Sequence, residues 1–94
     1  MRFKKSDFMI EDYTYGNTEV LGFGVSEILK GLDKKQWSEL VINSNSGTTQ
    51  TIFLDYIKTI KIYNNFVIFI GLMGNHDFLN LNNVLSISIV KHEV

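Results

Sequence analysis

The sequence predicts one mainly β domain, a small antiparallel β barrel or sandwich with a single short helix. The first reason is an internal repeat: residues 39–62 align with residues 66–89 at a constant offset of 27 residues, without a gap. The second reason is that apolar and polar residues alternate along short segments of both copies, which is typical of half-buried strands. The repeat therefore predicts a duplicated three-strand unit, whose aligned identities are Gly47/Gly74, Leu54/Leu81, Ile60/Ile87 and Ile62/Ile89.

Each copy is expected to contain a strand, a glycine turn, a second strand, a short interruption and a third strand. Glycine fits the two turns because tight hairpin turns need a residue with positive φ. In the last strand, Leu85, Ile87 and Ile89 alternate with serines, which predicts one buried face and one wet face. The predicted strands are residues 40–44, 48–54 and 58–63 in the first copy and 66–72, 77–81 and 85–92 in the second.

The N-terminal part of the chain is more polar and is expected to hold the helix. Thirteen of the nineteen charged residues precede Leu40, so this part is expected to be solvated. One or two short strands are expected within residues 2–15, followed by a glycine turn and a strand over residues 18–25. We interpret Gly22 and Gly24 within that strand as a β-bulge. The helix is predicted over residues 26–39. Ser26 caps its first part, Gly31 ends that part, and Asp33 caps the second part, in which Trp37 faces the core.

Composition excludes several classes of function. The 94 residues make one domain, and the net charge of −1 argues against non-specific binding to nucleic acid or to anionic membranes. The absence of cysteine excludes disulfides, thiolate zinc sites and cysteine nucleophiles. No signal peptide is evident, and the longest apolar run, residues 66–73, is too short to span a membrane. We therefore expect a cytoplasmic protein, and the abundance of Asn and Ile suggests a bacterial or phage accessory gene.

Residues 66–73 depart from the alternating pattern because both faces of this strand are apolar. Such a strand is either covered on both sides within the chain or uses one face as a subunit interface. The sequence leaves both possibilities open: the helix over residues 26–39 covers the second face, or another copy of the chain does.

One short string has the residue types of a metal site. Gly74-Asn75-His76-Asp77 resembles a metal-ligand box of the calcineurin-like phosphoesterases, and that resemblance implies a hydrolase that uses His76 and Asp77. The family also needs an earlier Asp-x-His and a Gly-Asp-x-x-Asp, because two metals require several ligands. This chain has neither motif. We therefore interpret Gly74-Asn75 as a hairpin turn and expect no catalytic residue, no metal and no cofactor.

A basic and aromatic patch, made of Lys30, Lys34, Lys35 and Trp37, offers the alternative function of nucleic-acid or small-ligand binding. With a helix before a small barrel, the arrangement is similar to Sm-like RNA-binding proteins, although no Sm signature is present. Acidic neighbours at Glu27, Asp33 and Glu39 neutralise the patch, which favours a solvated helix face.

The sequence thus favours a small non-catalytic protein-interaction module that associates with itself and binds a protein partner whose identity the sequence does not specify. Aromatic and large apolar residues dominate the energetics of such interfaces. The expected contact residues are therefore taken from the two-faced strand and from tyrosines expected to be exposed: Phe66, Ile68, Phe69, Ile70, Met73, Tyr13, Tyr15 and Tyr56.

Overall fold

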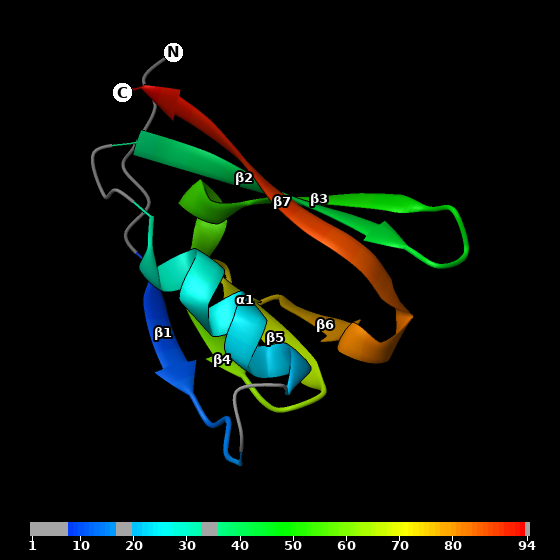
Figure 1. Cartoon of the computed structure of the whole chain (residues 1–94). Coiled ribbons are helices and arrows are strands. Elements are labelled where there is room, and N and C mark those ends of the chain that lie inside the picture. The colour runs from blue at the N-terminus through cyan, green and yellow to red at the C-terminus, as the bar shows by residue number, and fades with distance from the viewer. Residues whose placement is uncertain (1–7, 17–19, 33–35, 94) are drawn as a thin grey trace.

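The structure is a computed structural model that describes residues 8–16, 20–32 and 36–93, with the side chains of residues 36, 37 and 93 left out (Figure 1). It is mainly β, with one helix and two sheets. The order of strands is β1-β4-β5-β6 in the four-stranded sheet and β3-β2-β7 in the three-stranded sheet. The elements are β1 (Met9–Asp12), α1 (Leu21–Lys30), β2 (Gln36–Ser44), β3 (Thr49–Phe53), η1 (Leu54–Tyr56), β4 (Ile57–Ile62), β5 (Phe66–Gly71), β6 (His76–Asn80), η2 (Leu81–Asn83) and β7 (Val84–Glu93).

The duplicated three-strand unit is confirmed. Each copy runs strand, turn, strand, 3₁₀ turn, strand, and β6 and η2 begin 27 residues after β3 and η1. Backbone conformations also repeat, because Gly47 has φ 87° and Gly74 has φ 85°. The interruptions predicted in each copy are the two 3₁₀ turns, η1 and η2, which carry the chain from one sheet to the other.

The two copies pair crosswise. The third strand of the first copy, β4, pairs with β5, and the third strand of the second copy, β7, pairs with β2. The registers are equivalent, since Ile60 lies opposite Phe69 and Ile87 lies opposite Ile42. A matched pair of backbone hydrogen bonds joins each hairpin turn to the other copy's 3₁₀ turn: Leu72 donates to Tyr56 and Asn45 donates to Asn83, both at 2.9 Å. A pseudo-two-fold axis therefore relates the copies.

Both crossed pairs contain a β-bulge at the same place. The register shift leaves Lys58 without a paired residue on β5, and its equivalent Leu85 without one on β2. Leu85 was predicted to point inward, and this is wrong, because the bulge turns it out to 73% exposure. Ile87 and Ile89 do pack against the core, as predicted.

The core is built from equivalent positions of the two copies. Along β2 and β5, buried side chains alternate with partly buried ones, so each sheet turns one apolar face inward. Among the described strands no pairing joins the two sheets, so hydrogen bonds do not close them into a barrel. The inward pairs are Leu40/Val67, Ile42/Phe69, Ile52/Leu79, Leu54/Leu81, Ile57/Val84, Ile60/Ile87 and Ile62/Ile89, joined by Phe8, Val25, Leu29 and Leu32.

The helix lies earlier in the chain than predicted. Residues 20–25 were expected to continue a strand, but α1 begins at Leu21, and Ser26 is in its interior rather than at its N-terminus. Gly22, Val25, Ser26 and Leu29 are the buried residues, and their spacing of three and four places them on one helix face. Gly31 does follow the last helical residue, as predicted.

The second half of the predicted helix is a strand. Residues 36–40 belong to β2, which pairs with both β3 and β7, and the expected cap at Asp33 lies outside the described residues. Ser38, Leu40 and Ile42 are buried while Glu39 is half-buried, which is the two-residue period of a strand. Pairing with β7 along residues 36–40, and with β3 at residues 39 and 40, therefore overrides the capping pattern.

The expectation of a purely antiparallel fold is also corrected. Whereas the other strand pairs are antiparallel, β1 runs parallel to β4, with Ile10 opposite Ile60. A four-residue strand thus extends the four-stranded sheet at its β4 edge, and Ile10 packs against the core.

Asp12, at the end of β1, ties that strand to the helix. Its carboxylate accepts hydrogen bonds from the Thr14 hydroxyl at 2.6 Å and the Ser26 hydroxyl at 2.7 Å, and pairs with the Lys30 ammonium at 3.3 Å. The hydrogen bond from Thr14 lowers the pKa of Asp12 the most, burial opposes this, and the bonds from Ser26 and Lys30 lower it further. The folded state therefore favours the ionised form.

The helix approaches the β4–β5 turn closely at Gly22. The Gly22 amide donates to the Asn64 carbonyl at 2.9 Å, and a Cβ added to Gly22 would lie 1.9 Å from the Tyr63 carbonyl oxygen. Gly24, on the same helix, has nothing within 4 Å of such a Cβ. The interpretation of Gly22 and Gly24 as a bulge in a strand is therefore wrong, because both residues lie on α1. Only Gly22 has to be glycine, since the helix packs closely against the turn there.

These two glycines provide a matched test. Gly22→Ala is expected to lower the free energy of unfolding by about 2 kcal/mol, because the backbone of Tyr63 blocks the added methyl group. Gly24→Ala is expected to raise it by about 0.5–1 kcal/mol, because alanine favours an exposed helix position. Urea denaturation measures both, and equal effects of the two substitutions would contradict this packing.

Asp12 predicts a pH dependence of stability. Because its folded-state pKa is lowered, its contribution is complete above the ordinary carboxyl pKa of 3.8 and is lost as the pH falls below that value. Asp12→Asn is expected to cost about 1 kcal/mol at pH 7, and this difference is expected to shrink as the solution is acidified below pH 4. Urea unfolding at several pH values measures it. Glu11→Gln, on the opposite face of β1, is the control. Because it retains Asp12, its free energy of unfolding is expected to fall below pH 4 as that of the unchanged chain does.

Candidate interaction surface

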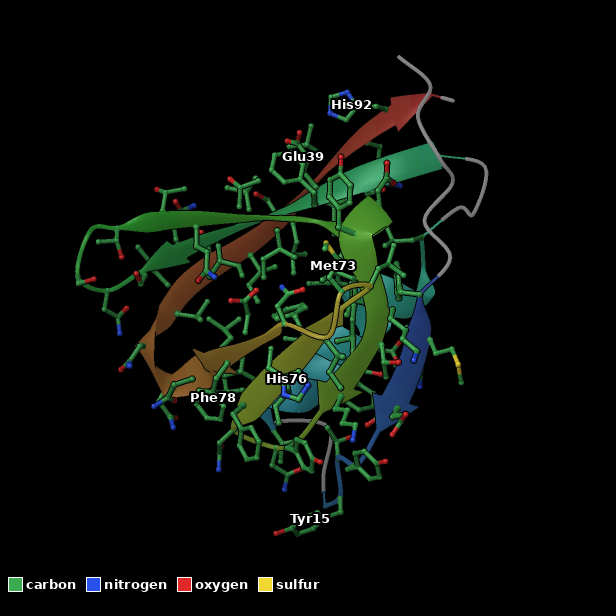
Figure 2. All side chains as sticks on the ribbon, turned by 180° about the vertical axis from the view of Figure 1, so that it is seen from behind. Tyr15, Glu39, Met73, His76, Phe78 and His92 are labelled. Carbon is green, nitrogen blue, oxygen red and sulfur yellow. The ribbon has the colours of Figure 1, made fainter. Side chains whose placement is uncertain are left out.

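The outer face of the four-stranded sheet carries several partly exposed apolar side chains. On β5, Val67 and Phe69 face the core, while Phe66, Ile68 and Ile70 face outward and are half-buried. Helix α1 joins the core from the inner side, so it does not cover this outer face. Figure 2 views the molecule from behind Figure 1, and His76 and Phe78 lie on the side turned to the viewer.

The rows of this outer face follow from the strand registers. Lys61 and Ile68 lie opposite each other, and Glu11 and Phe78 flank them on β1 and β6. One acidic and one basic residue therefore sit side by side among apolar neighbours. The neighbouring row contains Met9, Thr59, Ile70 and His76.

Four aromatic rings form a ladder across one end of this face. Tyr13 stacks on Tyr63 at 5.0 Å, Tyr63 on Phe66 at 4.4 Å, and Phe66 on Phe78 at 5.1 Å between ring centroids. Tyr13 is 47% exposed and Phe78 is 64% exposed, so both ends of the ladder reach solvent. The hydrogen bond that the Tyr13 hydroxyl donates to Glu11 raises the pKa of Tyr13 and holds the first ring in place.

The pseudo-two-fold axis supplies an internal comparison for this face. The outer face of the three-stranded sheet uses the equivalent positions of the same backbone, but its residues are mostly polar. Asn43 replaces Ile70, Thr51 replaces Phe78 and Glu39 replaces Phe66 at these positions. Because the polar copy folds in the same way, the fold itself does not require apolar residues on the outer face of the four-stranded sheet.

A second exposed apolar cluster lies where the first copy's 3₁₀ turn meets the second copy's hairpin turn. We call this cluster the apolar groove, and it lies between β3, η1 and the β5–β6 turn. Met73, labelled in Figure 2, projects there and is 96% exposed. The pseudo-symmetric groove has polar residues on its β2–β3 turn, Ser44, Asn45, Ser46 and Thr48, and apolar residues from the strands, Ile42, Phe78, Leu79 and Val84. The exposed apolar residues of the apolar groove are Phe53, Tyr56, Leu72 and Met73.

The predicted contact residues divide into four sets. Phe66, Ile68, Ile70 and Tyr13 lie on the outer face, while Tyr56 and Met73 lie in the apolar groove. Tyr15 is exposed at a distant tip, where Figure 2 shows it pointing away from the labelled residues. Phe69 is corrected: it is 1% exposed and belongs to the core, because strand alternation turns it inward.

Several residues of this surface were not identified from sequence. Phe78 and Tyr63 complete the ladder, and Phe53 and Leu72 complete the groove. Strand alternation contains a signal for Phe78, because its neighbour Leu79 is an inward position and the next residue along a strand points outward. No comparable local signal exists for the groove, which two turns from different copies form together.

The alternative basic patch does not assemble on one helix. Lys30 is on α1 and pairs with Asp12, whereas Trp37 is on β2, and its side chain is not described. Lys34 and Lys35 lie outside the described residues. The structure therefore does not bring Lys30 and Trp37 together on one helix face.

The other motifs tested for chemistry are surface features. The hairpin turn at Gly74 is confirmed by its φ of 85°, and His76 and Asp77 beside it are exposed. Within the described residues no three His, Asp or Glu side chains gather where a metal ion could be held. Among the described helices, none has the length and apolarity needed to cross a membrane.

No family model, curated protein or solved structure matches this chain in sequence or fold.

Proposed function

We propose that the chain is a non-catalytic protein-interaction module, a two-sheet sandwich that associates with a second copy through the outer face of its four-stranded sheet. The observation that supports this most is the internal comparison. Two faces built on equivalent backbones differ in chemistry, and only the face of the four-stranded sheet carries Phe66, Ile70 and Phe78 where its counterpart carries polar residues. Exposed apolar residues that a fold does not require are typical of an interaction site.

A second copy fits this face because the face is self-complementary. Its apolar rows supply the hydrophobic contact, and burying such surface is worth roughly 25 cal/mol per Å². Glu11 and Lys61 lie side by side in the same row. In a two-fold arrangement, Glu11 of one copy meets Lys61 of the other, so the same surface satisfies both partners.

The protein that this module would bind and modulate is expected to dock at the apolar groove. Tyr56 and Met73 protrude there, and large flexible or aromatic side chains are typical anchors of protein interfaces. The alternative, nucleic-acid binding, has less support: Lys30 already pairs with Asp12, and Glu11 neighbours Lys61. Both observations reduce the free positive charge that phosphate binding needs.

Self-association is tested by replacing outward residues of the four-stranded sheet with the polar residues found at the equivalent positions of the three-stranded sheet. The double variant Ile70→Asn, Phe78→Thr places on the outer face the residues found at the equivalent positions of the three-stranded sheet. Sedimentation velocity in the micromolar range is expected to find a dimer for the unchanged chain and a monomer for the double variant. The free energy of unfolding is expected to change by less than about 1 kcal/mol, since these are surface positions.

Leu85→Ser is the matched control, because it also removes an exposed apolar side chain but lies outside this face. It is expected to leave the dimer intact. A chain that remains monomeric throughout the range, or equal loss of the dimer in the control, would refute the proposal.

A further inference from the structure

The two halves of the molecule differ in what lies beside their third strands. In the four-stranded sheet, β4 pairs with β5 on one edge and with β1 on the other. In the three-stranded sheet, β7 pairs with β2, and no described strand occupies its second edge (Figure 1). Because β4 and β7 are equivalent strands, the free edge of β7 corresponds to the edge on which β1 is seated.

The equivalent isoleucines of the two strands also differ, because those on β4 are more deeply buried than those on β7. Ile60 and Ile62 on β4 are 0% exposed. Their counterparts Ile87 and Ile89 on β7 also face the core but are only partly buried. The same residue type at the same place in the strand therefore lacks cover beside β7, on the side where β1 and α1 cover β4.

The edge of β7 has few of the features that prevent a strand from pairing. Native edge strands are usually short, bulged or charged along their length. β7 has ten residues, with its bulge at Leu85 near the start and Lys91 near the end. The five residues between them, residues 86–90, contain no charge and no proline. That stretch is longer than β1, which has four residues.

We propose that residues 86–90 of β7 form a docking edge for an extended segment of a protein partner, which pairs parallel to β7 as β1 pairs with β4. In that register the partner residue opposite Ile87 takes the place of Ile10 and is apolar. The residue opposite Ile89 takes the place of Asp12. It is apolar as well. The Ser26 hydroxyl and the Lys30 ammonium, which bind the Asp12 carboxylate, lie beside β4, so a carboxylate beside β7 would not meet them. The ligand is thus a short strand with apolar residues at alternate positions.

A second copy of the chain fits this edge less well. The β1 strand of a second copy is already held on its own β4 by Asp12. Antiparallel pairing of two β7 strands around Ser88 would place Lys91 of each opposite the bulged Leu85 of the other. A bulge disrupts the hydrogen-bond ladder at that point. A strand from another protein, running parallel, meets neither obstacle.

The test uses a tethered strand as the probe. A second copy of residues 8–12 carrying Asp12→Leu is fused to the C-terminus of the full chain through a Gly/Ser linker. About 30 linker residues have a reach of roughly 30 Å, which matches the length of a ten-residue strand and gives a millimolar effective concentration. Asp12→Leu removes the carboxylate that would favour the edge of β4. The fusion is made in the Ile70→Asn, Phe78→Thr background, so the outcome does not depend on association through the outer face.

Hydrogen exchange of backbone amides is the measurement. The fusion is expected to slow exchange within residues 86–90 about ten-fold or more, while a matched fusion carrying Ile10→Asp in the added strand is expected to leave it unchanged. Equal exchange in the two fusions would overturn the proposal. Protection of the same amides that rises with concentration in the unfused chain would also overturn it, because the edge would then belong to a second copy.

Discussion

Crossed pairing between the two copies is the constraint on which the rest of this structure depends. Neither three-strand unit forms a sheet of its own, since the third strand of each pairs with the first strand of the other. The 3₁₀ turns η1 and η2 make this possible by redirecting the chain between sheets. Each unit therefore buries its apolar face only when the other is present, and one shared core results.

The duplicated scaffold separates what the fold needs from what it does not need. Inward positions remain apolar in both copies, as at Leu40/Val67 and Leu54/Leu81. Outward positions differ at several places, where Glu39, Asn43 and Thr51 of the three-stranded sheet correspond to Phe66, Ile70 and Phe78 of the four-stranded sheet. Packing constrains the first set, because voids and polar groups at these positions would cost free energy in the core. The second set is free to vary, so its apolar character indicates an interaction.

The N-terminal segment breaks the pseudo-symmetry. β1 and α1 cover the β4 side of the molecule, and Asp12 joins them through Ser26 and Lys30. Nothing equivalent is described beside β7, whose inward isoleucines remain partly exposed. The asymmetry thus leaves a strand edge and partly exposed apolar residues on β7, whereas β1 and α1 cover the equivalent edge and residues of β4.

The sequence by itself determined the repeat, its two glycine turns and the alternation of strand faces, because these features are local: positive φ selects glycine and the pleat imposes a period of two. Tertiary structure decided the rest. The local pattern at Gly22 predicts a bulge in a strand, yet Gly22 is the point where a helix approaches the backbone of Tyr63. Residues 36–40 have a helix-capping pattern before them, yet they form a strand because all five pair with β7, and Glu39 and Leu40 also pair with β3. The outward face of β5 and the apolar groove depend on which elements lie beside them, and contacts between residues far apart in the chain fix that arrangement.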